Sequence, residues 1–250
     1  MLRLIRSATL LVELGGTTLL VDPMLGDPHT LPPFENTAPA TKNPLVGLPQ
    51  PTTKIVSAAQ VVLVTHLHRD HFDPTAEALI DRATPIVCQP ADAATLAAKG
   101  FSDVRPVDSR LDVHGVTVKR VAARHTLGHH EAELGPCSGF VLEAPGEPVL
   151  HIAGDCVWCP ELAEVIDEHR PAVIVVNGGA ARFLDGAPIS MTAEDVIGAA
   201  RHAPFATLVA VHLEALNHCP MSRDELRRHL VAAGLDERVR VPDDGEALRW

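Results

Sequence analysis

Residues 65–73 read T-H-L-H-R-D-H-F-D, and they follow directly on the apolar run V-V-L-V. At the end of a strand, His66 and His68 project to the same side, because side chains alternate along an extended chain. Asp70 and His71 follow where the chain has to turn. Nitrogen and oxygen donors in this mixture suit zinc, manganese or iron. The stretch therefore predicts a metal site rather than a solvated, histidine-rich loop.

The composition describes a folded protein without a nucleic-acid partner. The chain of 250 residues is long enough to bury a substantial core, and a hydrophobic content of 46% excludes a disordered chain. Aromatic residues make up only 3%, so the core has to consist mainly of Val, Leu, Ile and Ala. The formal net charge is −11, with no run of Lys or Arg, which argues against binding to DNA or to an RNA backbone.

The cysteines and the N-terminus indicate a cytoplasmic protein. Five cysteines are an odd number and do not resemble the disulfide framework of a secreted domain. Arg3 and Arg6 precede a short apolar stretch, but Glu13 interrupts it and no small-residue cleavage site follows. No apolar run is long enough to span a bilayer. We expect a cytoplasmic protein with a small-molecule substrate and no membrane partner, and a homo-oligomer remains open.

Strands dominate the first half of the chain, whereas the second half alternates strands and helices. Gly15-Gly16 separates two strand-like runs and predicts a β-hairpin. Helix starts are predicted at Asp73-Pro74, at Thr192 with Asp195, and at Ser222, where Glu225 completes a full capping box. This order predicts an α/β (α+β) fold, with two packed sheets, helices outside and a single domain over residues 1–250.

The segment 27–53 contains seven prolines and has little periodicity. A long stretch without regular structure inside a compact domain is typical of a functional loop. It separates a strand from the histidine cluster, so we expect a proline-rich loop that roofs the active site. A surface excursion is the alternative.

Four residues cannot complete two metal sites, so further ligands are needed. Three later strand-like runs each end in a suitable donor, namely His125, Asp155 and His212. Rigid strands hold donors more accurately than loops do, so ligands at strand ends are expected of a site built on a sheet.

These motifs together resemble the metallo-β-lactamase superfamily, a four-layer αββα sandwich. H-L-H-R-D-H is followed in the expected order by His125, Gly154-Asp155 and His212, over nearly the whole chain. The runs L-V-D-P at residues 20–23 and G-F-V-L-E at residues 139–143 resemble its ascorbate-6-phosphate lactonase-like branch. The resemblance implies that one metal is held by His66, His68 and His125. It implies that the other is held by Asp70, His71 and His212, with Asp155 bridging the two.

Two departures from the pattern leave alternatives open. Cys156 stands where the branch usually has a hydroxyl residue, and we favour a buried structural thiol over a residue that tunes the metals. His129 and His130 compete with His125 for the place of the third histidine ligand. We prefer His125 because it directly ends a strand.

Three further residues are candidates for the surroundings of the metals. Asp22 ends a strand and can orient a ligand, although capping a turn before Pro23 explains it equally well. Asn177 and His218 lie just beyond strand ends and can contact substrate. Ordinary turn and core roles are more common for both.

The function expected from these residues is metal-dependent hydrolysis. Two divalent metal ions, zinc first and manganese or iron next, share a hydroxide that attacks a small ester, lactone or phosphoester. Asp70 is the expected catalytic residue, because it can hold the hydroxide in line or carry a proton to the leaving group. The alternatives are a non-haem iron redox enzyme on the same fold, a phosphodiesterase for small nucleotides and a non-catalytic binding protein. The complete ligand set argues against the last.

Overall fold

The computed structural model describes residues 1–250. In it, the apolar runs of the sequence form two sheets of seven strands each. The first sheet consists, in spatial order, of β14 (Ala247–Leu248), β1 (Leu2–Arg6), β2 (Thr9–Leu14), β3 (Thr17–Val21), β4 (Val61–Val64), β5 (Ile86–Cys88) and β6 (Val104–Pro106). The second consists of β13 (Val239–Arg240), β12 (Thr207–Val211), β11 (Val173–Asn177), β10 (Leu150–Ile152), β9 (Ser138–Glu143), β8 (Val116–Ala122) and β7 (Arg110–Val113).

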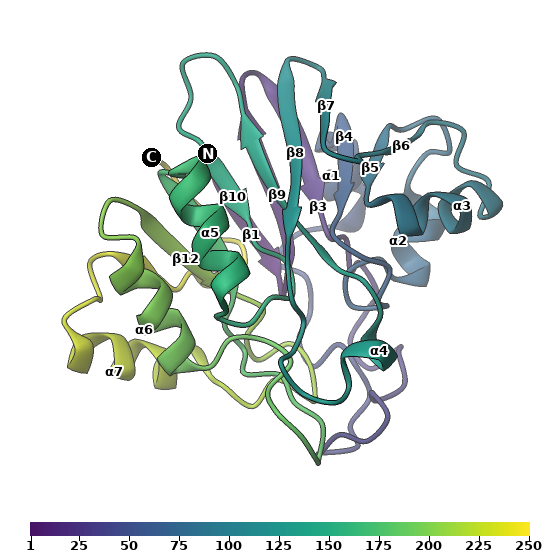
Figure 1. Ribbon diagram of the computed structural model, residues 1–250. Coiled ribbons are helices and arrows are strands. Elements are labelled where there is room, and N and C mark those ends of the chain that lie inside the picture. Colours follow the sequence, from purple (N-terminus) through teal and green to yellow (C-terminus); the bar gives the residue numbers. More distant parts are fainter.

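Helices cover the outer face of each sheet, with the strands between them (Figure 1). On the first sheet lie α1 (Thr52–Ala58), α2 (Pro74–Leu79) and α3 (Pro90–Ala98). On the second lie α5 (Pro160–His169), α6 (Ala193–His202) and α7 (Arg223–Ala233). A one-turn helix, α4 (Glu131–Leu134), lies at the lower edge in Figure 1. The predicted four-layer αββα sandwich is confirmed.

Strand periodicity explains the layers. In β4, Val61 and Leu63 point into a cluster of 22 buried residues that both sheets share, whereas Val62 and Val64 face the helices of the first sheet. A second cluster of 22 residues fills the space between the second sheet and α5, α6 and α7. Because these strands are buried on both faces, they read as continuous apolar runs in the sequence.

The predicted helix start at residue 192 is confirmed, whereas the one at residue 222 is capped differently from the prediction. Thr192 and Asp195 form a complete capping box, with bonds of 3.2 Å and 3.0 Å. Ser222 accepts the Glu225 N–H at 3.1 Å, but the Glu225 side chain does not return a bond, so the predicted full box is wrong there. The Glu214 carboxylate instead accepts the Arg223 N–H of the first turn at 2.6 Å.

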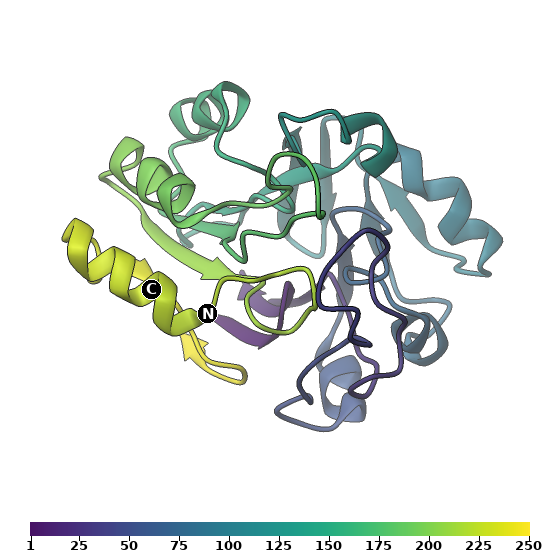
Figure 2. The ribbon, with the colours of Figure 1, turned by 90° about the horizontal axis from the view of Figure 1, so that it is seen from below.

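The strand directions bring the expected ligands to one edge of the molecule. Strands β3, β4 and β5 are parallel to one another, as are β10, β11 and β12. β8 runs in the same direction as β10, because both are antiparallel to β9. The carboxyl ends of β3, β4, β8, β10, β11 and β12 therefore lie at the lower edge in Figure 1, which Figure 2 views from below.

The segment between β3 and α1 crosses this edge without forming a helix or strand. The fully buried Arg6 donates hydrogen bonds of 2.8–2.9 Å to the carbonyls of Met24, Gly26 and Val46. The Asn217 amide bonds Asn43 at 2.8 Å, so the segment lies beside the connection that follows β12 (Figure 2). The proline-rich segment is thus held by buried polar groups. None of the helices is both long enough and apolar enough to cross a membrane.

Candidate metal centre

Three histidines from two different sheets meet at the edge described above. His66 and His68 follow β4, and His125 follows β8. His66 Nε2 lies 2.9 Å from His68 Nδ1, and one ligand atom from each of the three rings lies within 4.8 Å of the others. The structure therefore places His125 in this group.

Asp70, His71, Asp155 and His212 form a second group, directly beside the first. His71 Nε2 lies 3.3 Å from Asp155 Oδ2, and His212 Nε2 lies 3.3 Å from Asp70 Oδ2. All four side chains are buried. The tight turn after His68 makes this arrangement possible, because the N–H of His71 bonds back to the His68 carbonyl at 2.9 Å.

The Asp155 carboxylate lies between the two groups. Its Oδ2 atom is 3.2 Å from His125 Nε2, 4.0 Å from His66 Nε2 and 3.3 Å from His71 Nε2. Its Oδ1 atom accepts a hydrogen bond of 2.6 Å from the Asn177 amide at the end of β11. Asn177 therefore fixes the plane of a carboxylate that faces histidines of both groups.

The side chains present fit metal ions. Asp70 Oδ1 and the Nε2 atoms of His71, His125 and His212 are buried without a hydrogen-bond partner. Each such atom costs about 1–3 kcal/mol unless something else occupies its position. Donors bound about 2.1 Å from a tetrahedral zinc ion lie roughly 3.4 Å apart, close to the separations found here. The unpartnered atoms and their spacing are thus those of ligands to a cation.

In three of the histidine rings, one nitrogen has a partner outside the two groups, so the other nitrogen points towards the centre. His125 Nδ1 bonds the Ile189 carbonyl at 2.6 Å, and His68 Nε2 bonds the Leu134 carbonyl at 2.9 Å. His212 Nδ1 lies 3.3 Å from the Cys219 sulfur. Such outer partners fix the ring orientation of metal-binding histidines. Neither backbone carbonyl has a signal in the sequence, and Cys219 was not predicted to contribute.

Asp22 contacts residues in or next to both groups of metal-ligating side chains. Its carboxylate lies 2.8 Å from His71 Nδ1 and accepts bonds of 2.8 Å and 2.7 Å from the N–H and hydroxyl of Thr65. The Thr65 hydroxyl lies in turn 3.0 Å from His66 Nδ1. Asp22 therefore orients ring donors of both groups rather than only capping a turn.

The electrostatics keep the carboxylates ionised. Burial alone would raise the pKa of Asp155, but His71, His212 and His125 hold that pKa well below its usual range. Burial likewise opposes the charged form of His71, yet Asp155, Asp22 and Asp70 raise the pKa of this imidazole well above its usual range. A metal ion binds the neutral imidazole, so a proton and a cation compete for Nε2 of His71.

Two other candidates lie apart from these ligand atoms. Cys156 is buried in the apolar cluster beneath the helices of the second sheet, where its sulfur bonds the N–H of Arg124 and the carbonyl of Val157, both at 3.3 Å. His129 and His130 gather around Asp185 instead of joining His66 and His68.

A pocket of about 510 Å³ opens onto the two groups. The ring centroids of His218 and Phe34 lie 4.2 Å apart, and the Arg69 guanidinium carbon lies 4.3 Å from the centroid of the same Phe34 ring. The pocket is lined by Phe34, Glu35, Asn36, Leu67, His68, Arg69, Asp70, His125, Glu133, Leu134, Asp155, Phe183, Ile189 and His218. The proline-rich segment thus contributes part of the wall.

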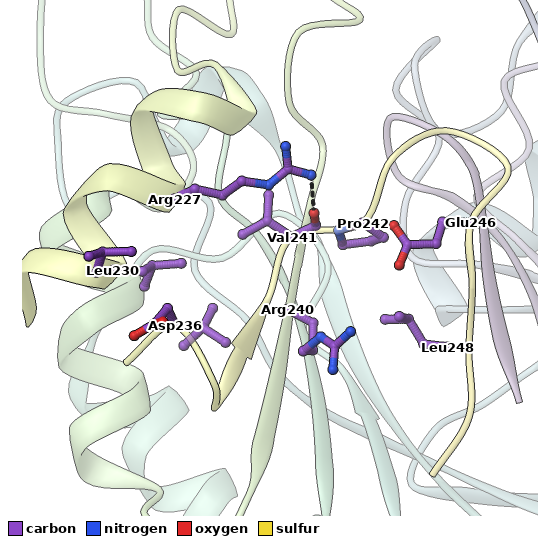
Figure 3. A pocket seen from close by; sticks show the side chains of 10 residues that line it. Arg227, Leu230, Asp236, Arg240, Val241, Pro242, Glu246 and Leu248 are labelled. Atoms are coloured by element: carbon purple, nitrogen blue, oxygen red, sulfur yellow. Dashed lines mark hydrogen bonds between the residues drawn. The ribbon is translucent and has the colours of Figure 1, made fainter. Parts of the chain in front are cut away.

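A separate pocket of about 370 Å³ lies between α7 and the edge strands β13 and β14 (Figure 3). Arg227 closes one side by donating a bond of 2.7 Å to the Val241 carbonyl. None of the residues that line it belongs to a group of metal-ligating side chains. The donors for metal chemistry therefore lie at the strand ends and not in this pocket.

Comparison with known proteins gives matches over most of the chain. Residues 17–213 match the family described as beta-lactamase superfamily domain. The UPF0173 protein YddR of Bacillus subtilis is 36% identical over 249 residues, which cover 98% of each chain. The structure of a possible metal-dependent hydrolase from Veillonella parvula superposes with a TM-score of 0.94 at 33% identity, covering 98% of this chain and 97% of that one. An isothiocyanate hydrolase from Delia radicum gut bacteria superposes with a TM-score of 0.94 at 31% identity, covering 100% and 98%.

Proposed function

The chain belongs to the UPF0173 family of metal-dependent hydrolases with the metallo-β-lactamase fold, and we propose that it uses a dinuclear metal centre to hydrolyse a small molecule at an electrophilic carbon. One observation carries this proposal. The Asp155 carboxylate faces His66 and His125 on one side and His71 on the other, at 3.2–4.0 Å. A shared carboxylate between two groups of metal-ligating side chains supports two ions rather than one.

The donor set favours zinc. The two groups together offer five imidazoles and two carboxylates, a mixture that suits zinc first and also accommodates manganese or iron. His66, His68 and His125 would hold one ion, and Asp70, His71 and His212 the other, with Asp155 between them. When bound, such ions lower the pKa of a shared water to about 7 and thereby supply a hydroxide at neutral pH.

Asp70 and His218 are the residues best placed to act on the substrate. Asp70 lines the pocket, so its carboxylate can accept a proton and pass it to a leaving group. His218 also lines the pocket, and its Nδ1 atom is buried without a partner. A hydrogen bond from His218 would orient a polar atom of the substrate.

The pocket supports a small substrate with an apolar part. Phe34, Phe183 and Leu67 provide apolar walls near the donors, and the volume is within the range of small-molecule sites. An ester or lactone fits this environment and agrees with the lactonase-like motifs. A phosphoester or small phosphodiester fits less well, because Glu35 and Glu133 line the same pocket and repel a phosphate.

Isothiocyanate hydrolysis is a second candidate. The isothiocyanate hydrolase from Delia radicum gut bacteria matches this chain over its whole length with a TM-score of 0.94. In that reaction water adds to the central carbon of R–N=C=S, and the adduct breaks its carbon–nitrogen bond to give the amine and carbonyl sulfide. An apolar R group would contact the phenylalanine walls, and the nucleophile would be the same as for an ester.

Metal analysis and a substrate screen on the same preparation test the proposal. We expect two metal ions per chain and turnover of a lactone, an aryl ester or benzyl isothiocyanate. Asp155→Ala should lose metal and turnover together while keeping a cooperative unfolding transition. Full metal content and turnover in that variant would contradict the bridging role.

The remaining alternatives give different results in the same experiment. Stoichiometric iron with oxygen consumption would favour a redox enzyme, and turnover of bis(p-nitrophenyl) phosphate alone would favour a phosphodiesterase. A loaded protein that hydrolyses none of these substrates would support a binding protein.

A further inference from the structure

A third group of metal-ligating side chains lies at the rim of the pocket, outside the proposed centre. His129 Nε2 is 3.7 Å from Asp185 Oδ2, and His130 Nε2 is 3.7 Å from Asp185 Oδ1. One donor atom from each of the three lies within 4.8 Å of the others. If the two histidine–Asp185 distances of 3.7 Å shorten by a few tenths of an ångström, they reach the value of about 3.4 Å expected for donors around a tetrahedral ion.

We propose that His129, His130 and Asp185 bind a separate divalent transition-metal ion at the rim of the pocket. Two imidazoles and a carboxylate are the ligands preferred by Zn²⁺ and its neighbours, and not by Ca²⁺ or Mg²⁺. His129 and Asp185 are exposed, so the ion keeps open positions for water.

The surroundings of His130 are those of a metal-binding histidine. Its Nδ1 atom bonds the Glu133 carboxylate at 2.9 Å, which is the carboxylate–histidine arrangement that fixes the ring and leaves Nε2 for the metal. His130 Nε2 also lies 3.3 Å from the Asp185 carbonyl, and a bound cation replaces that contact.

Gly186 lets the chain approach both rings. Its φ of 96° lies in the left-handed region, and a Cβ atom there would come within 3.1 Å of His129 Cε1 and of His130 Cδ2. The two rings lie 4.0 Å apart, centroid to centroid. Because Gly186 has no Cβ, the rings of His129 and His130 can pack closely against the backbone next to Asp185.

The ion would join the three segments that wall the pocket. His130 is the N-cap of α4, which carries the pocket residues Glu133 and Leu134. Asp185 lies in the connection between β11 and α6, and the Asn36 amide of the proline-rich segment donates to its carboxylate. The rim ion would thus tie these three segments to one another.

The test compares zinc binding by the full chain and by the double variant His129→Gln/Asp185→Asn, with His229→Gln as control. His229 is exposed on α7 and makes no contact with the pocket. Equilibrium dialysis against zinc at a buffered free concentration should show one zinc ion per chain fewer in the double variant and no loss in the control. Equal zinc content in all three proteins would overturn the proposal. The difference of one ion is expected whether the Asp155 centre holds two ions, one or none.

Hydrogen exchange gives a second readout that does not depend on activity. Zinc should slow exchange in residues 126–135 and 180–187 of the wild-type chain, and the double variant should lose this effect. Protection around Asp155 should persist in the double variant. Zinc-induced protection of both rim segments that survives in the double variant would also overturn the proposal.

Discussion

The Asp22 carboxylate lies 2.8 Å from Nδ1 of His71, while Nε2 of the same ring lies 3.3 Å from Asp155. A residue at the end of β3 thus orients a ring that belongs to the turn after β4. The two strands are paired in parallel, so their ends keep a fixed spacing. The position of His71 is therefore set by the sheet as well as by the tight turn that carries it.

Replacing Asp22 by Asn should weaken metal retention without removing a proposed ligand. The amide keeps the size of the side chain but loses the charge that holds His71, and losses of about 10–100-fold in affinity are typical for such outer partners. Competition with a zinc chelator measures the dissociation constant. Asp167→Asn, an exposed change on α5, is the matched control. An Asp22→Asn protein with unchanged zinc affinity would show that His71 needs no such partner.

Two buried cysteines should behave differently on truncation. Cys219→Ala removes the sulfur 3.3 Å from His212 Nδ1 and should lower zinc affinity, by less than the Asp22 change because a thiol is a weak partner. Cys156→Ala should lower the free energy of unfolding by about 1 kcal/mol, with zinc affinity unchanged, because its sulfur bonds backbone groups in the apolar cluster and no metal-ligating side chain of the centre. Denaturant unfolding and competition with a zinc chelator, measured on both variants, test this difference. A lower zinc affinity in Cys156→Ala would indicate that Cys156 does tune the metals.

His151 should make the protein sensitive to acid. It is fully buried in β10, both ring nitrogens lack a partner, and burial lowers its pKa to about 3. The unfolded chain takes up a proton near pH 6.5 while the folded chain does not, so stability present above pH 6.5 is lost as the pH falls towards 3. Between pH 7 and 5 this loss is about 2 kcal/mol.

The variant His151→Leu isolates this contribution. Its stability relative to the wild-type chain should rise by that amount between pH 7 and pH 5, measured by urea unfolding at both values. His229→Leu, an exposed change on α7, serves as the control histidine. A stability difference between His151→Leu and wild type that is independent of pH would mean that the ring takes up its proton at the same pH in the folded and unfolded chains.

Arg6 should control the order of the proline-rich segment. Its guanidinium bonds the carbonyls of Met24, Gly26 and Val46, and Arg6→Met would leave these acceptors unpaired at a cost of about 1–3 kcal/mol each where they stay buried. We expect faster hydrogen exchange over residues 22–48 and a higher KM, because Phe34 in this segment lines the pocket. Arg3→Met on the same strand, with one bond to Gly245, is the control. Unchanged exchange over the segment would contradict this role.

Much of the fold could be predicted because the signals are local. The continuous apolar run of β4, the glycine pair between β2 and β3, and the Asp73 cap of α2 each depend on a few adjacent residues. The helices α1 and α3 are absent from the prediction, and the other elements absent from it are short or polar. β14 has two residues, α4 is a single turn, and β7 reads R-L-D-V with one buried side chain. Pairing with a neighbour defines such elements, and the neighbour is distant in the chain.

The sequence alone determined which chemistry is available: H-x-H-x-D-H after a buried strand, and single donors at the ends of later strands. Only the tertiary structure decided which donors meet. It placed His125 rather than His129 or His130 beside His66, and it placed Cys219 rather than Cys156 against a ring. Backbone carbonyls at Leu134 and Ile189 orient two further rings, although every residue has a carbonyl. The physical reason is that strand direction and sheet packing, which are properties of the whole chain, fix the separations of a few tenths of a nanometre on which metal binding depends.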